Sequence, residues 1–83
     1  MALRLMLTRQ ALGLDQKEFA GRAKIATNTY NQYETGTNKP SLEMALALKD
    51  AYQLSLDWIY DGDNANLRHE LAEAIKALRA ARK

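Results

Sequence analysis

The sequence contains no cysteine, and this absence excludes several classes of site. Disulfide bonds and metal sites built on thiolates are impossible, and a chain without them is compatible with the reducing cytoplasm, where we expect the protein. His69 is the only histidine, and no acidic cluster with ligand spacing lies near it. We therefore expect no metal and no cofactor, and we interpret His69 as an exposed residue of a helix.

Long apolar runs and catalytic constellations are also missing. No stretch approaches the ~20 apolar residues that a membrane-spanning helix requires, so we expect no membrane partner. The leucine-rich stretch 1–14 is interrupted by Arg4 and Arg9 and has no cleavage site, so we interpret it as a helix rather than a targeting segment. Because no nucleophile is paired with a base and no glycine-rich phosphate loop occurs, we do not expect an enzyme.

The net charge of +2 is unevenly distributed over a chain of 83 residues, the size of one small domain. Residues 1–40 have a net charge of +3, residues 41–66 of −4, and residues 67–83 of +3. A basic first block favours a polyanionic partner, with the acidic block turned away from it. The asymmetry is modest, and a solvated surface without any partner would have a similar distribution.

Apolar residues recur at helical spacing along most of the sequence, and no strand pattern occurs. Apolar spacing and cap residues predict an all-α protein with helices at about 2–12, 16–23, 27–35, 42–52, 56–60 and 66–82. The predicted caps are Asp15 (with Glu18), Thr27 in preference to Ala26, Ser41 and Ser55 at helix starts, and Gly13 and Gly36 at helix ends. The predicted inward residues are Leu5, Met6, Leu12, Phe19, Ala20, Ala23, Ile25, Tyr30, Tyr33, Leu42, Ala45, Leu48, Tyr52 (or Ala51), Leu56 and Ile59.

Residues 15–36 form the motif around which the chain is organised: two short helices joined by a tight turn. Ala20 is small enough for two helices to cross closely, and Tyr30 and Tyr33 place the second helix on the same core. The opposite face of the second helix carries a row of polar side chains: Thr27, Asn28, Asn31 and Gln32. This is the pattern of a helix-turn-helix that offers amides and a hydroxyl to a partner.

Four blocks of residues in this order resemble the phage repressor/Cro, or XRE, family of helix-turn-helix domains. They are LGLDQ leading into Phe19-Ala20, then YETG at 33–36, KPSLE at 39–43 and LSLD at 54–57. The resemblance covers about residues 4–61 and implies a five-helix fold that binds double-stranded DNA, usually as a dimer on a palindromic operator. The chain departs from the family at Lys24 and Gln53, where glycine is usual, and at Ala26, where serine is usual.

The resemblance and the chemistry of the polar row together give the expected DNA contacts. Asn and Gln can pair with adenine edges in the major groove, whereas other side chains hold the phosphates. The expected base contacts are Thr27, Asn28, Asn31 and Gln32; the expected backbone contacts are Gln16, Lys17, Lys24, Tyr33, Asn38 and Lys39. Residues 25–38 contain no Lys or Arg, so affinity must come from the flanks. The alternative is a merely solvated polar face.

The resemblance also implies a partly buried ion pair between Arg9 and Glu34, the alternative being two independent solvated charges. The division that we expect is a DNA-binding domain at 1–62 and a C-terminal helix at 63–83. Heptad-like spacing on that helix predicts a homodimer seam, or alternatively a face that completes the core of one chain. The seam residues are Leu67, Leu71, Ala74, Ile75 and Leu78. Trp58 and Tyr60 fit either the core or a dimer patch.

Two functions of different class follow from these observations. The first is a sequence-specific DNA-binding transcriptional regulator, a small dimeric repressor. The second is a protein-interaction module on the same fold, such as an antiactivator or antitoxin, which has a protein partner and does not bind DNA. The neutral polar helix and the acidic block at 41–66 keep the second function open.

Overall fold

Six α-helices make up the protein in the computed structural model, which describes residues 2–81. They are α1 (Ala2–Ala11), α2 (Gln16–Arg22), α3 (Thr27–Thr35), α4 (Leu42–Tyr52), α5 (Leu56–Asp61) and α6 (His69–Ala81). The predicted all-α fold, five helices with an added sixth, is confirmed. No helix among residues 2–81 is long and apolar enough to cross a bilayer.

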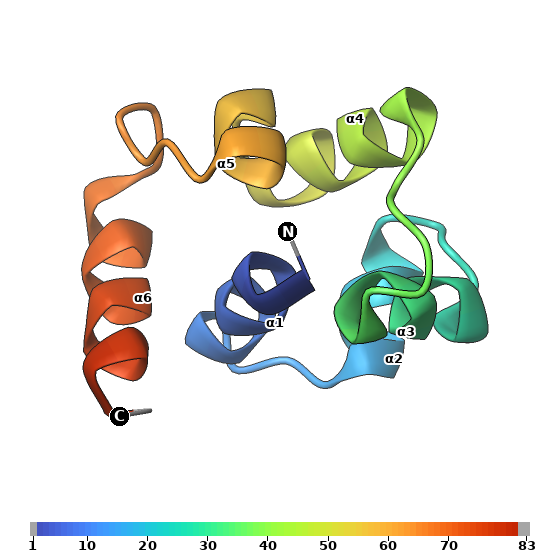
Figure 1. Ribbon diagram of the computed structural model, residues 1–83, viewed down its shortest axis with the longest axis horizontal. Helices are drawn as coiled ribbons and strands as arrows, with labels where there is room; N and C mark the ends of the chain where they lie inside the picture. Colours follow the sequence, from blue (N-terminus) through green and yellow to red (C-terminus); the bar gives the residue numbers. More distant parts are fainter. Residues whose placement is uncertain (1, 82–83) are drawn as a thin grey trace.

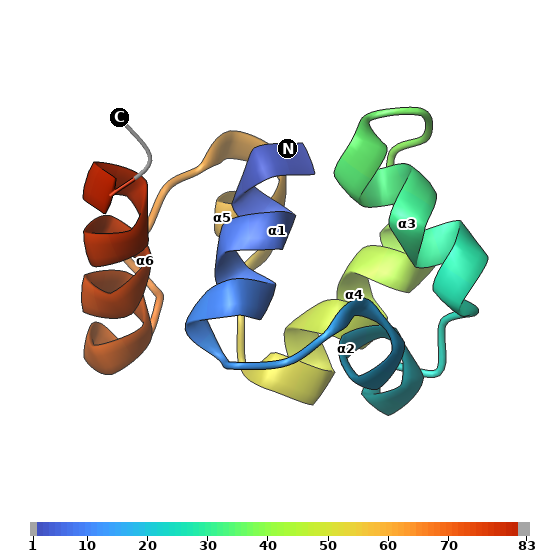
Figure 2. The ribbon, with the colours of Figure 1, turned by 90° about the horizontal axis from the view of Figure 1, so that it is seen from below.

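Helix α1 occupies the centre of the arrangement (Figure 1). It packs against α3 on one flank and against α6 on the other, while α4 and α5 run across one end of the bundle. The view from below shows the same order, with α1 between α6 and the pair α2 and α3 (Figure 2). Because neighbours cover α1 on several sides, Leu7 and Thr8 are fully buried beside Leu5, whereas the predicted inward residues Met6 and Leu12 are only half-buried.

Aromatic side chains form the centre of the core between α2, α3 and α4. Phe19 stacks on Tyr52 with ring centroids 4.3 Å apart and packs against Tyr30 at 5.1 Å. The Tyr52 hydroxyl donates to the backbone carbonyl of Phe19 at 2.7 Å, so the polar end of the ring is satisfied inside the core. These contacts fix α2 against the C-terminal end of α4.

The core excludes one residue that the pattern had placed inside. Leu42 is 60% exposed, because the buried stripe of α4 starts one turn later at Ala45 and continues through Leu48 and Tyr52. The structure also shows which of the two aromatic residues of α5 lies in the core. Trp58 is 2% exposed and belongs to the core, whereas Tyr60 is 36% exposed.

Side-chain caps begin three of the helices as predicted. The Asp15 carboxylate accepts the backbone N–H of Glu18 at 2.8 Å, and the hydroxyls of Ser41 and Ser55 accept the third N–H of α4 and α5. The prediction that Thr27 caps α3 is wrong. Thr27 is already helical, and the cap residue is Ala26, whose methyl group accepts no hydrogen bond.

Two turns have a left-handed residue that is not glycine. Lys24 has a φ of 59° and Gln53 a φ of 55°, and no other non-glycine residue described has a positive φ. These are two of the three positions at which the chain departs from the XRE pattern, which has glycine at both. The backbone conformation that the family builds with glycine is therefore retained here with a side chain in place.

Helix α6 turns its apolar face toward α1. Leu67, Leu71 and Ile75 are buried, while Ala74 and Leu78 are half-buried. The helix begins at His69, later than the predicted residue 66, because Leu67 N–H bonds to the carbonyl of Asn64 in a turn. The face predicted as a homodimer seam thus packs within one chain in this conformation, which corresponds to the alternative reading, and self-association stays a prediction.

Candidate nucleic-acid interface

Helices α2 and α3 are joined by a turn of four residues whose hydrogen bonds fix their crossing. Ile25 N–H donates to the carbonyl of Ala20 at 2.9 Å, and Lys24 N–H donates to that of Gly21 at 3.0 Å. Ala20 is fully buried at the crossing, as its small side chain predicted. Tyr30 and Tyr33 are buried on the inner face of α3, so the opposite face is directed away from the core.

The outer face of α3 is polar and uncharged. Thr27, Asn28 and Asn31 are exposed, and Gln32 is half-buried. The only charged residue of this helix is Glu34, whose side chain is 5% exposed and directed inward to Arg9. The surface therefore offers hydrogen-bonding groups without a cation of its own.

The amide of Asn28 has a defined orientation. Its Oδ1 atom accepts the backbone N–H of Thr29 at 3.0 Å, in the first turn of the helix. Because a backbone N–H can be matched only by the oxygen of the amide, the NH₂ group is left free to donate. This bond satisfies an N–H that Ala26, as the cap, cannot reach with a side chain. Asn28 thus presents a donor.

The other end of α3 is tied to the loop that follows it. The side-chain amides of Gln32 and Asn38 are hydrogen-bonded, and Asn38 N–H donates to the carbonyl of Gln32 at 3.2 Å. The hydroxyls of Thr35 and Thr37 lie 2.9 Å apart beside them. Lys39, next in the loop, is exposed. Residues 35–39 therefore extend the polar surface beyond the helix.

A buried network holds α3 on α1. Arg9 Nε lies 2.7 Å from Glu34 Oε2, so the ion pair expected between them is present, and Arg9 Nη1 donates to the carbonyl of Leu14 at 3.0 Å. The Tyr30 hydroxyl and the Gln16 amide also donate to Glu34. Every hydrogen-bonding oxygen of this inward carboxylate is therefore occupied, as a buried charge requires.

The network shifts the pKa values of its members. Burial alone raises the pKa of Glu34, but hydrogen bonds from Arg9, Tyr30 and Gln16 outweigh it and leave that pKa below its ordinary value. The pKa of Arg9 is raised, chiefly by its hydrogen bond to Glu34. The pKa of Tyr30 is raised mainly by burial and then by the bond to Glu34, so its hydroxyl stays a donor.

A family model described as helix-turn-helix matches residues 5–59, about two thirds of the chain. The chain belongs to the XRE-type helix-turn-helix family. It is 30% identical over 83 residues to the HTH-type transcriptional regulator ImmR of Bacillus subtilis (strain 168), across 92% of this chain and 65% of that protein. No solved structure matches the chain significantly. Helix α6 lies outside the matched range.

Four of the residues expected to contact the DNA backbone are exposed. Lys17, Lys24 and Lys39 are exposed at the start of α2, in the turn and in the loop after α3, and Asn38 is exposed beside Lys39. Asn38 is joined to Gln32 on the polar face of α3, and the phosphate contacts of the three lysines stay predictions.

Two residues expected at the phosphates are partly or largely buried. The Gln16 side chain is half-buried and donates one amide N–H to Glu34 at 3.0 Å, which leaves its second amide N–H and its backbone N–H for an anion. Tyr33 is 5% exposed and packs in the core, and its contact with a phosphate stays a prediction. Thr35 and Thr37 were missed, although their hydroxyls border Gln32 and Asn38; the polar run TGTN after the helix was their signal.

Proposed function

We propose that the protein is a sequence-specific DNA-binding transcription regulator that reads the major groove with α3. The observation that carries this proposal is the uncharged, exposed amide row of α3 on a helix-turn-helix scaffold. In such motifs the second helix enters the major groove and its N-terminal residues contact the base edges. The Glu34 network keeps α3 rigid on α1, which supports a fixed docking geometry.

The orientation of the amides supports a specific kind of readout. Asn28 has its oxygen engaged by Thr29 and presents NH₂ donors, which match the acceptor atoms N7 and O6 of guanine. Asn31 is exposed and makes no side-chain hydrogen bond within residues 2–81, so it can pair through both amide atoms with adenine. Each well-placed contact of this kind contributes ~1–3 kcal/mol of base discrimination.

Affinity in this proposal comes from the flanks of α3. Lys17, Lys24 and Lys39 are exposed around the amide row and are the ammonium groups available to phosphates. Neutralising about three phosphates per chain predicts a slope of about −2.7 for log affinity against log salt, and about twice this for a dimer. A bound domain also excludes other proteins from the same groove, so repression is the regulatory outcome that we propose.

The deciding experiment combines selection from a random duplex pool with a salt titration. We expect one sequence to be enriched and its affinity to fall steeply with salt. The control is the triple variant Lys17→Gln, Lys24→Gln, Lys39→Gln, which should bind more weakly with a flatter slope. Absence of any DNA binding at low salt would overturn the proposal and favour the alternative, a module that binds a protein partner.

We further propose that the regulator is a homodimer on a palindromic operator, paired through a surface other than the α6 face. The exposed large apolar residues are Leu3, Leu42, Leu46 and Tyr60. The Tyr60 hydroxyl donates to the carbonyl of Pro40 at 3.3 Å, so the end of α5 adjoins the start of α4. Arg4, next to Leu3, donates to the Tyr60 carbonyl at 2.9 Å. These contacts support a continuous apolar patch.

The loop after α3 leads directly into this patch, which supports a second copy as its occupant. A dimer on two half-sites must place both α3 helices on one side, about 34 Å apart, and this patch is the surface that we propose for its two-fold axis. Sedimentation of Leu46→Glu tests this surface, with Ala51→Glu, at another exposed position of α4, as the control. We expect wild type and Ala51→Glu to dimerise and Leu46→Glu to be monomeric with weaker operator binding. A monomeric wild type would contradict the proposal.

A further inference from the structure

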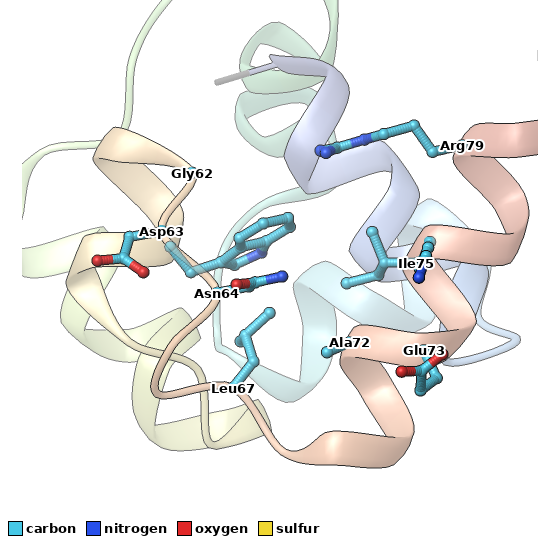
Figure 3. A pocket seen from close by; sticks show the side chains of 10 residues that line it. Gly62, Asp63, Asn64, Leu67, Ala72, Glu73, Ile75 and Arg79 are labelled. Carbon is cyan, nitrogen blue, oxygen red and sulfur yellow. The ribbon is translucent and has the colours of Figure 1, made fainter.

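A cavity of about 470 Å³ lies between α6 and the segment that connects it to α5. All of its lining residues except Trp58 come from beyond residue 59, where the family match ends. Figure 3 shows Asp63, Asn64 and Leu67 of the connecting segment on one side of the cavity and Ala72, Glu73 and Ile75 of α6 on the other. The cavity is therefore a feature of the added segment and is separate from the polar face of α3.

The connecting segment creates this space by turning away from the domain before α6 begins. Gly62 has a φ of 78° and reverses the chain after α5. The Asp63 carboxylate accepts the N–H of Ala65 at 2.9 Å, and Leu67 N–H donates to the carbonyl of Asn64 at 3.1 Å. These hydrogen bonds hold the segment in a curved loop, and the buried side chain of Leu67 brings the chain back to the core.

The inner wall of the cavity is apolar. It consists of Trp58, Leu67 and Ile75, which are at most 9% exposed. Figure 3 shows the side chains of Leu67 and Ile75 directed into the cavity from two different elements. These side chains leave little of their own surface in water, but they make this end of the cavity apolar, and a flat or aliphatic group is the kind that fits against it.

The rim is cationic at one end. Arg79 has its guanidinium carbon 5.9 Å from the centroid of the Trp58 ring, and Lys76 lies one helical turn below on the same side of α6. Within residues 2–81 neither cation forms an ion pair. Two carboxylates also line the cavity. That of Asp63 accepts a hydrogen bond within its own loop and points away from the cavity, whereas Glu73 lies on α6, three residues before Lys76 (Figure 3).

We propose that this cavity binds a small aromatic carboxylate, with the ring against Trp58, Leu67 and Ile75 and the carboxylate between Lys76 and Arg79. The volume lies within the range of about 300–1,000 Å³ typical of small-molecule sites. Two free cations beside an apolar wall match an organic anion better than a neutral or cationic ligand. A bound molecule touches both α5 and α6 and therefore stabilises the packing of α6 on the domain.

The test uses three probes that differ only in the head group: 3-phenylpropionate, its neutral amide and 3-phenylpropylamine. Trp58 is the only tryptophan, so its indole N–H gives a single resonance from a side chain that lines this cavity. We expect 3-phenylpropionate to shift this resonance and the amides of residues 72–79 saturably, with a dissociation constant of about 1 mM or tighter. The other two probes should bind at least about tenfold more weakly.

The variant Lys76→Gln, Arg79→Gln should lose about tenfold or more in affinity for 3-phenylpropionate. The control Arg68→Gln, an exposed cation outside this cavity, should bind like wild type. Backbone amide dispersion checks that each variant is folded, and the single variant Lys76→Gln repeats the test with the Arg79 contact to Trp58 intact. The proposal is overturned if no probe binds saturably, if all three probes bind alike, or if removal of the cations changes nothing.

Discussion

The indole N–H of Trp58 donates a 3.0 Å hydrogen bond to the hydroxyl of Thr8, the one buried polar residue of the described core. The Thr8 hydroxyl in turn donates to the Arg4 carbonyl at 2.7 Å. Thr8→Val keeps the shape but leaves the buried indole N–H unmatched, so we expect the free energy of unfolding to fall by ~1–3 kcal/mol. Chemical denaturation measures this. If Trp58→Phe is introduced first, Thr8→Val should cost much less, and an equal cost would exclude the bond as the cause.

Removal of the Glu34 side chain should be among the most damaging changes outside the apolar core. Glu34→Ala strands Arg9, whose side chain is 15% exposed, and also unpairs Tyr30 and Gln16. We expect a loss of ~3–5 kcal/mol in the free energy of unfolding, as for other buried pairs broken on one side. Glu43→Ala, at an exposed position, is the control. A loss below about 1 kcal/mol would mean that the pair behaves as a surface ion pair.

The same carboxylate makes stability depend on pH. Its pKa is lower in the folded protein than the ordinary value of 4.5, because the hydrogen bonds to Glu34 outweigh the effect of its burial. Stability from Glu34 is therefore complete above the unfolded pKa and is lost as pH falls through the folded pKa. Denaturation curves between pH 7 and the acid range should show a smaller decline for Glu34→Gln than for wild type. An equal decline would contradict this.

The two left-handed turns can be tested by restoring glycine. Lys24 and Gln53 adopt a φ that costs a residue with a Cβ about 1 kcal/mol. Lys24→Gly and Gln53→Gly should therefore leave thermal stability unchanged or slightly higher. Gly36→Ala is the reverse control. Its φ is 81° and nothing lies within 4 Å of an added Cβ, so only backbone strain should lower its melting temperature. Destabilisation by either glycine variant above about 1 kcal/mol would contradict the strain argument.

Asn28→Asp separates DNA binding from stability. The carboxylate can still accept the Thr29 N–H, and a negative charge in the first turn of a helix adds ~0.3–1 kcal/mol. The variant loses the NH₂ donors and repels phosphates, so we expect DNA binding to be lost while thermal stability is kept or increased. Binding assays and thermal unfolding on the same sample decide. Unchanged DNA affinity would remove Asn28 from the interface.

Gln32 and Lys39 should differ in what they recognise. Gln32→Ala should lower affinity for the selected site by roughly 5–150-fold, equivalent to ~1–3 kcal/mol, with little change on random DNA. Lys39→Ala should weaken both and flatten the salt slope by about one unit. Asn38→Ala frees the Gln32 amide and should alter base preference without changing the salt slope. Equal losses on selected and random DNA would refute the role of Gln32.

Local signals account for what the sequence predicted well. Helix order and the caps at Asp15, Ser41 and Ser55 depend on residues within a few positions of one another. The burial of Thr8 could not be predicted from neighbouring residues. Its burial requires an indole 50 residues away that needs an acceptor.

The predicted DNA contacts also differ in whether local sequence or tertiary packing determines them. Exposure of Thr27, Asn28 and Asn31 follows from helical periodicity opposite the buried tyrosines. The engagement of Gln16 by Glu34 depends on tertiary packing, and amide chemistry alone does not reveal it. The apolar face of α6 was predicted, but its position was not, because the same spacing fits a partner helix and the flank of α1 equally well.

The central position of α1 sets the order in which the fold can be completed. This helix comes first in the chain, yet one of its flanks is covered by α6, about 65 residues later. Contacts of such long sequence separation form late, because the intervening loop must close before they stabilise anything. During synthesis α1 therefore meets α3 first and keeps an apolar flank exposed to water until α6 has emerged. Helix α6 thus completes the environment of α1, although these two are the most distant of the described helices along the sequence.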